Sequence, residues 1–92
     1  MLGAADMTKE HQQRPIGVYL CDDVPEMREL LRVVLEDEGM RIAGEAGDAL
    51  TMLREVAALD PDVVVLDLSL PGMDGLEAIP RVHAAAPRAT RR

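Results

Sequence analysis

The chain has 92 residues, enough for one small domain, and a formal net charge of −7 at pH 7. Its core must be aliphatic, because 48% of the residues are hydrophobic while only 1% are aromatic. The acidity and the lack of aromatic stacking surfaces argue against direct contact with nucleic acid. One cysteine excludes an internal disulfide, and no apolar run has the length of a membrane span or a secretory signal. We therefore expect a cytoplasmic protein that has no membrane segment.

The beginning of the chain, residues 1–14, shows no hydrophobic period and ends in a polar run, which predicts a disordered tail. Residues 16–21 are a short apolar run and predict a buried strand. Asp22 and Asp23 follow this run directly. Two carboxylates are therefore predicted at the carboxyl end of the first strand.

A helix is predicted next, from Pro25 to the residue before Gly39. Proline is well tolerated in the first helical turn, and glycine commonly ends a helix. Apolar side chains recur between these two residues at the spacing of one helix face, which favours core packing over a partner surface. These side chains are Met27, Leu30, Leu31, Val34 and Leu35.

Residues 40–46 alternate weakly between apolar and polar side chains, as is typical of a strand near a sheet edge. Asp48 can cap the helix that follows. The apolar face of that second helix is formed by Leu50, Leu53, Val56 and Ala57. A second strand–helix unit is therefore predicted.

The third apolar run, residues 63–66, has no polar position, and such a strand belongs inside a parallel sheet that is covered on both faces. Asp67 ends this run. A further helix is predicted to start near Asp74 and to be kinked or broken at Pro80, because proline removes a backbone hydrogen bond inside a helix. The basic residues 88–92 show no pattern of secondary structure and predict an unstructured tail.

Three strand–helix units in succession predict an α/β fold with one parallel sheet and helices on both faces. If the first strand lies between the second and the third, the strand order reverses beside it. Ligands bind such sheets at the carboxyl ends of the strands at that reversal. Asp22, Asp23 and Asp67 would meet there.

Three neighbouring carboxylates repel one another, and a divalent cation removes the conflict. Carboxylate oxygens suit Mg²⁺, and no cysteine or histidine in these motifs favours zinc. Beside such a metal ion, Asp67 can act as a nucleophile and accept a phosphoryl group. A helix-capping role for Asp22 or Asp23 without any metal is the plainer alternative.

These aspartates, together with the segment Leu70-Pro71-Gly72-Met73-Asp74-Gly75-Leu76, resemble the receiver domain of bacterial two-component response regulators. The helix after Asp23 and the turn at Gly44 particularly resemble receivers of transcriptional regulators. The resemblance implies a flavodoxin-like, doubly wound parallel sheet with only the first three βα units present. The domains would be a tail (1–14), a partial receiver domain (15–87) and a basic tail (88–92).

The resemblance also implies roles for individual residues. Asp67 would be the phosphoacceptor, which receives its phosphoryl group from a sensor histidine kinase. Asp23 would bind Mg²⁺ directly, and Asp22 would bind it directly or through water. Asp67 and the main-chain carbonyl of Ser69 would complete the protein ligands, and Met27 would belong to the kinase-docking face.

The departures from the family pattern lie after the third helix. In the family the fourth strand ends in a serine or threonine and the fifth in a lysine, and both contact the phosphoryl group. No lysine follows Asp67, and Thr90 follows no apolar strand. The third strand would then have an unpaired edge, open to aggregation or to a homodimer. We expect a truncated receiver with weak Mg²⁺ binding and impaired phosphorylation.

We expect this chain to be a phosphoacceptor module rather than a turnover enzyme. A haloacid-dehalogenase-like phosphatase also uses a strand-end aspartate with Mg²⁺, but it has a second aspartate two residues later, where this chain has Ser69. The other alternative is a fragment that binds a sensor kinase, or dimerises, without being phosphorylated.

Overall fold

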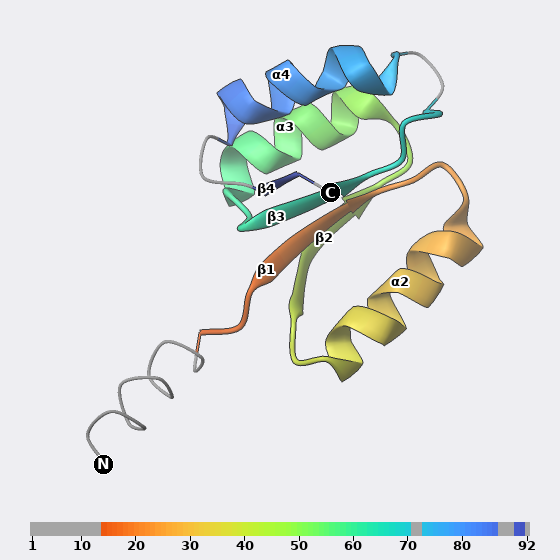
Figure 1. Ribbon diagram of the computed structural model, residues 1–92, viewed down its shortest axis with the longest axis vertical. Helices are drawn as coiled ribbons and strands as arrows, with labels where there is room; N and C mark the ends of the chain where they lie inside the picture. The colour runs from red at the N-terminus through yellow and green to blue at the C-terminus, as the bar shows by residue number, and fades with distance from the viewer. Residues whose placement is uncertain (1–13, 71–72, 87–89, 92) are drawn as a thin grey trace.

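The computed structural model describes residues 14–70, 73–86 and 90–91. Four parallel strands form one sheet in the order β2-β1-β3-β4. The elements are β1 (Gly17–Cys21), α2 (Pro25–Asp37), β2 (Arg41–Ala46), α3 (Ala49–Leu59), β3 (Val63–Leu66), α4 (Gly75–Ala85) and β4 (Thr90–Arg91). Helix α2 covers one face of the sheet, and α3 and α4 lie side by side on the other (Figure 1). The predicted parallel sheet, with β1 between β2 and β3, is confirmed.

Local sequence explains where the helices begin and end. Pro25 opens α2, and Gly39, with φ 87°, turns the chain back toward β2 in a conformation that favours glycine. The side chain of Asp48 caps α3 by accepting from the main-chain nitrogen of Thr51 at 2.8 Å. Hydrogen bonds from the main chain and hydroxyl of Thr51 lower the pKa of Asp48. None of the described helices combines the length and hydrophobicity that a membrane crossing requires.

Helix α4 runs from Gly75 to Ala85 through Pro80, so of the two predicted alternatives, a kink or a break, the break is wrong. The side chain of Asp74 caps this helix by accepting from the main-chain nitrogen of Leu76 at 2.9 Å. Two buried residues on either side of the proline, Ala78 and Val82, hold the helix against the core. These contacts outweigh the single backbone hydrogen bond that a proline removes.

The core lies on the face covered by α3 and α4. Alternate side chains of the central strands enter it, among them Tyr19 of β1 and Val64 of β3, which are 0% and 1% exposed. Both helices contribute fully buried residues, such as Met52 of α3 and Ala78 of α4. The hydroxyl of Tyr19 also donates to Glu55 Oε1 at 2.6 Å, which ties the centre of the sheet to α3.

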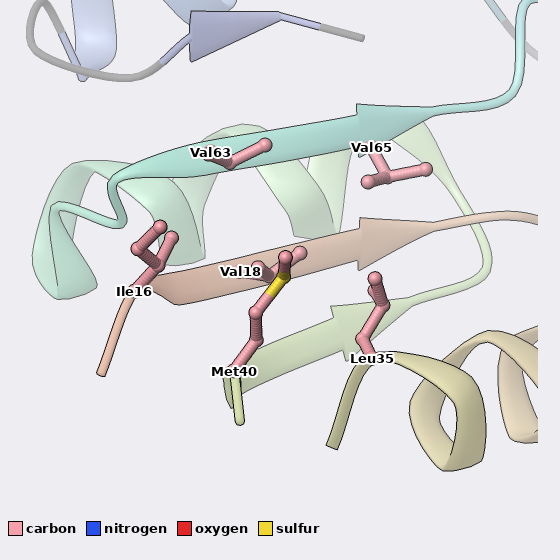
Figure 2. Close-up of a pocket in the computed structure, with 6 residues that line it drawn as sticks. All are labelled: Ile16, Val18, Leu35, Met40, Val63 and Val65. Atoms are coloured by element: carbon pink, nitrogen blue, oxygen red, sulfur yellow. The ribbon is translucent and has the colours of Figure 1, made fainter. Parts of the chain in front are cut away.

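The opposite face is less completely covered. Helix α2 packs against β1 and β2 and contains no buried residue. An apolar cavity of about 270 Å³ opens between the sheet and the C-terminal end of α2 (Figure 2). Its lining consists of Ile16, Val18, Leu35, Met40, Val63 and Val65. The expectation that the third strand is covered on both faces is therefore wrong for the face with α2, where Val63 and Val65 are half-buried.

Strand β4 was not expected from the sequence. Thr90 and Arg91 pair in parallel with Val63 and Val64 of β3. The expectation of an unstructured tail is thus wrong for these two residues, and the edge of β3 is paired along its first half. A two-residue strand carries no periodicity, so only its pairing with β3 reveals it. Residues 1–13 of the predicted tail 1–14, together with residues 87–89 and 92, lie outside the described residues.

Candidate functional site

The three predicted aspartates come together at the carboxyl ends of β1 and β3. One carboxylate oxygen of each of Asp22, Asp23 and Asp67 lies within 4.8 Å of those of the other two. Cys21 and Leu66 are partners in the parallel ladder, so the residues that follow them leave the sheet side by side. The main-chain nitrogen of Asp67 donates to the carbonyl of Cys21 at 2.9 Å and continues this ladder. The fold thus brings the carboxylates together, while their roles as ligands and acceptor stay predictions.

Asp67 is held in one orientation by Ser69. Its Oδ1 accepts hydrogen bonds from the main-chain nitrogen and from the hydroxyl of Ser69, each at 2.9 Å. Within the described part of the chain, no hydrogen bond reaches Oδ2 of Asp67. One oxygen of this half-buried carboxylate is therefore fixed, and the other remains available for a ligand or a reaction.

The loop with the other two aspartates is anchored at both ends. The main-chain nitrogen of Asp22 donates to the carbonyl of Ala46 at 3.1 Å, next to the end of β2. Oδ1 of Asp22 accepts from the main-chain nitrogen of Val24 at 2.9 Å, just before α2. Asp23 between them is exposed. The loop therefore presents Asp23 to solvent and turns Asp22 partly back onto the chain.

Within the described residues, the arginines Arg28, Arg32 and Arg81 form their ion pairs with Glu45 and Glu77 and not with the carboxylates of this cluster. In an octahedral Mg²⁺ site with bonds of about 2.1 Å, adjacent ligand oxygens lie about 3 Å apart and opposite ones about 4 Å apart. The oxygens of Asp22, Asp23 and Asp67 are close enough to reach such distances by small side-chain rotations. The residues present therefore fit a divalent cation that prefers oxygen ligands.

Cys21 lies directly beneath the cluster and is 1% exposed. Burial, together with the negative charges of Asp48, Asp22 and Asp67, raises the pKa of its thiol to about 12. A neutral thiol is a poor metal ligand, because metal ions bind the thiolate. Cys21 is thus a small core residue, as its place at the end of an apolar run suggests.

Thr90 does not belong to this cluster. It pairs with Val63, which lies four residues before Asp67 in β3. Four residues of a strand span about 13 Å, so Thr90 lies toward the opposite end of β3 from the aspartates. Arg28, by contrast, was given no role from the sequence and contacts the Asp22 loop through its guanidinium. Its position one turn into the helix after Asp23 is the only sequence signal that could have indicated this contact.

Residues 18–91 match the response regulator receiver domain family. The chain belongs to this family. It is 44% identical over 72 residues to protein-glutamate methylesterase/protein-glutamine glutaminase 3 of Hahella chejuensis. It is 47% identical over 77 residues to protein-glutamate methylesterase/protein-glutamine glutaminase 5 of Myxococcus xanthus. These matches cover 78% and 80% of this chain but 21% and 22% of the relatives. The receiver chain thus spans about a fifth of the length of the curated relatives it matches.

Solved receivers have the same fold. The response regulator domain of Thermotoga maritima CheB is similar with a TM-score of 0.76 and 30% identity, over 85% of this chain and 60% of that one. A LuxR-family regulator from Aurantimonas sp. SI85-9A1 is similar with a TM-score of 0.77 and 34% identity, over 85% and 56% of the two chains. The predicted flavodoxin-like receiver fold with its first three βα units is confirmed.

The expectation that this chain is not an enzyme is contradicted by its relatives. The curated proteins named above are enzymes, and the receiver matches only a part of each. The acid motif predicts a phosphoryl site and carries no information about the activity of the protein to which a receiver is joined. Kinship with transcriptional regulators stays a prediction, since the similar proteins include both methylesterases and a LuxR-family regulator. The haloacid-dehalogenase alternative finds no support in the family match.

Proposed function

We propose that this receiver is a phosphoacceptor module, in which Asp67 takes a phosphoryl group from a sensor histidine kinase at a Mg²⁺ site formed with Asp22 and Asp23. The observation that carries the proposal is the convergence of three carboxylate oxygens within 4.8 Å. Receiver domains in general interact with sensor histidine kinases and bind Mg²⁺ at their acidic pocket, which supports the same roles here.

The geometry at Asp67 favours one of its two oxygens as the nucleophile. Ser69 occupies Oδ1 with two hydrogen bonds and fixes the plane of the carboxylate. Oδ2 forms the new bond to phosphorus while the bond between phosphorus and the donor's leaving group breaks, and the leaving group keeps that electron pair. The product is an aspartyl phosphate on Asp67.

A bound Mg²⁺ would offset the negative charge that gathers on the phosphoryl oxygens. Asp23 is the exposed carboxylate and would bind the ion directly. Asp22 would contribute the oxygen that Val24 leaves free. The main-chain carbonyl of Ser69 is proposed as a further ligand, in keeping with the resemblance to receivers.

Incubation with acetyl phosphate and Mg²⁺, followed by measurement of intact mass, tests the proposal. The wild-type chain should gain one phosphoryl group, and Asp67→Asn should gain none. Asp23→Asn should react at least about 10-fold more slowly, because it removes a metal ligand. Asp37→Asn is the matched control, since this exposed acid lies at the far end of α2 and should leave the reaction unchanged.

An adduct that persists in Asp67→Asn would contradict the assignment of the acceptor. A folded wild-type chain that gains no phosphoryl group would contradict the proposed function itself. The impaired phosphorylation expected from the sequence stays a prediction, and the adduct rate relative to the Thermotoga maritima CheB receiver measures it.

A second proposal concerns the activity that this receiver serves. Identities of 44% and 47% to two protein-glutamate methylesterase/protein-glutamine glutaminases favour a role in controlling that class of reaction. Protein isolated from its source should then release methanol from a glutamyl methyl ester, and acetyl phosphate should change the rate. Sequence-specific DNA binding in place of this hydrolysis would favour kinship with the LuxR-family regulators instead.

Dimerisation through the third-strand edge also stays a proposal. Among the described residues, β4 covers this edge at Val63 and Val64, which leaves Val65 and Leu66 for pairing with a second copy. Sedimentation equilibrium tests it: Leu66→Pro should lower the dimer fraction of the folded protein, because the main-chain N–H groups of Val65 and Asp67 point toward β1 and that of Leu66 points toward the open edge.

A further inference from the structure

Arg28 lies behind the acid cluster and joins three parts of the chain. From the first turns of α2, its Nη1 donates to the main-chain carbonyl oxygen of Asp22 at 2.6 Å. Its Nε donates to Glu45 Oε1 at 3.0 Å, on the neighbouring strand β2. The side chain is only 20% exposed. One guanidinium therefore connects α2, β2 and the loop that carries two of the three carboxylates.

The turn after β2 leaves room for this guanidinium. A β-carbon at Gly47 would lie 3.2 Å from Nη1 of Arg28, closer than an ordinary van der Waals contact. The same β-carbon would lie 3.9 Å from the carbonyl oxygen of Asp22 and from Cα of Asp23. Arg28 and the Asp22–Asp23 loop thus pack closely against a turn that has no side chain at this point.

The charge of Arg28 is directed away from the aspartate carboxylates. Within the described residues its ion pair is with Glu45, which also pairs with Arg32. Its contact with Asp22 is to the main-chain oxygen and not to the side chain. Arg28 can therefore fix the loop without competing with a cation for the carboxylate oxygens.

We propose that Arg28 is a positioning residue for the metal site, which holds the main chain of Asp22 so that the carboxylates of Asp22 and Asp23 face Asp67. This inference rests on the proposed function, because it requires a cation at the three aspartates. Removing Arg28 would have two opposite effects on the affinity for a cation. Loss of a nearby positive charge would tighten cation binding, whereas loss of the loop's support would weaken it.

Calorimetric titration with Mg²⁺ distinguishes these two effects. In Arg28→Met the dissociation constant should rise about 10-fold, the lower end of the range for residues that orient metal ligands. Arg28→Lys keeps the charge but cannot make both contacts at once, so its affinity should lie between those of Arg28→Met and the wild type. Arg32→Met is the matched control, because Arg32 pairs with the same glutamate without a hydrogen bond to the loop. Its affinity should stay within about 2-fold of the wild type.

Urea unfolding is measured for each variant alongside the titrations, to show which variants are folded. An unchanged or tighter Mg²⁺ affinity in folded Arg28→Met would overturn the inference, as would equal weakening in Arg32→Met. If Arg28→Met does not fold, wild-type affinity in Arg28→Lys overturns it instead. A folded wild-type chain that binds no Mg²⁺ would overturn the proposed function, and this inference with it. If the wild-type chain binds Mg²⁺ and folded Arg28→Met binds it equally well, the inference about Arg28 fails while the proposed function stands.

Discussion

The two faces of the sheet differ in how completely helices cover them. On the face with α3 and α4, fully buried side chains come from the strands and from both helices. On the face with α2, the helix contributes none, and Leu30 and Val34 are 56% and 49% exposed. The central strand is nevertheless buried on both sides, since Leu20 on one and Tyr19 on the other are each 0% exposed.

The difference therefore arises from the helices and from β3, and not from the central strand. Two helices span the width of the sheet on one face, while α2 covers β1 and β2 on the other and leaves Val63 and Val65 beside a cavity. The acid cluster lies where these two regions meet, because Asp23 leads into α2 and Asp67 leads toward α4. On one side this cluster adjoins the buried core, and on the other it adjoins the hydrogen bonds of Arg28 with Glu45 and with the main chain of Asp22.

The largest expected effect on stability is the difference between two variants, each of which truncates one side chain on one face of the sheet. Met52→Ala removes a side chain that is 0% exposed and should lower the free energy of unfolding by about 2 to 5 kcal/mol. Leu30→Ala on α2 should lower it by less than about 1 kcal/mol, because the side chain is more than half exposed. Urea unfolding followed by circular dichroism measures both. Equal losses would show that the face with α2 is as well packed as the other.

A smaller loss of stability should appear at high pH, because two titratable side chains are buried on the face covered by α3 and α4. Burial raises the pKa of Cys21 from 9.0 to about 12, and burial also raises the pKa of Tyr19. The unfolded chain therefore loses these protons first, so stability is full below pH 9 and falls as the pH rises toward 12. The Cys21 term costs about 1 kcal/mol between about pH 8 and about pH 10.

The variant Cys21→Ala isolates that term. Its free energy of unfolding should fall about 1 kcal/mol less than that of the wild type over the same pH interval. Urea titrations at the two pH values, with the thiol kept reduced, provide the measurement. Identical pH dependence in both proteins would mean that the thiol is not insulated in the folded state.

The smallest effect on stability is expected from polar substitutions on the exposed face of α2. Met27→Gln combined with Leu30→Gln should change the free energy of unfolding by less than about 1 kcal/mol, since both side chains are more than 40% exposed. The same variant should bind less of a dye that fluoresces on apolar surfaces. Undiminished fluorescence would mean that the dye does not bind to the exposed face of α2. A loss of fluorescence in Val65→Thr would then show that the dye binds in the cavity.

Much of the candidate site could be predicted because its signals are local. Asp22, Asp23 and Asp67 each follow an apolar run, and parallel strands bring such ends to one edge of the sheet. The helix cap at Asp48 and the start of a helix near Asp74 could likewise be predicted, since each residue bonds to a main-chain nitrogen only two or three positions later. The contacts of Arg28 were not predicted, because its position in the first turn of the helix is the only local signal for the contact with Asp22, and its other partner, Glu45, lies 17 residues away along the chain.

The sequence by itself determined the strand and helix segments, the acid residues at the strand ends and the membership of the receiver family. These depend on hydrophobic periodicity and on spacing, which act over a few residues. Only the tertiary structure decided that β4 pairs with β3, that α4 continues through Pro80 and that α2 leaves one face open. Each of these depends on which surfaces meet across the sheet, and burial between distant segments outweighs the local preference of a single residue.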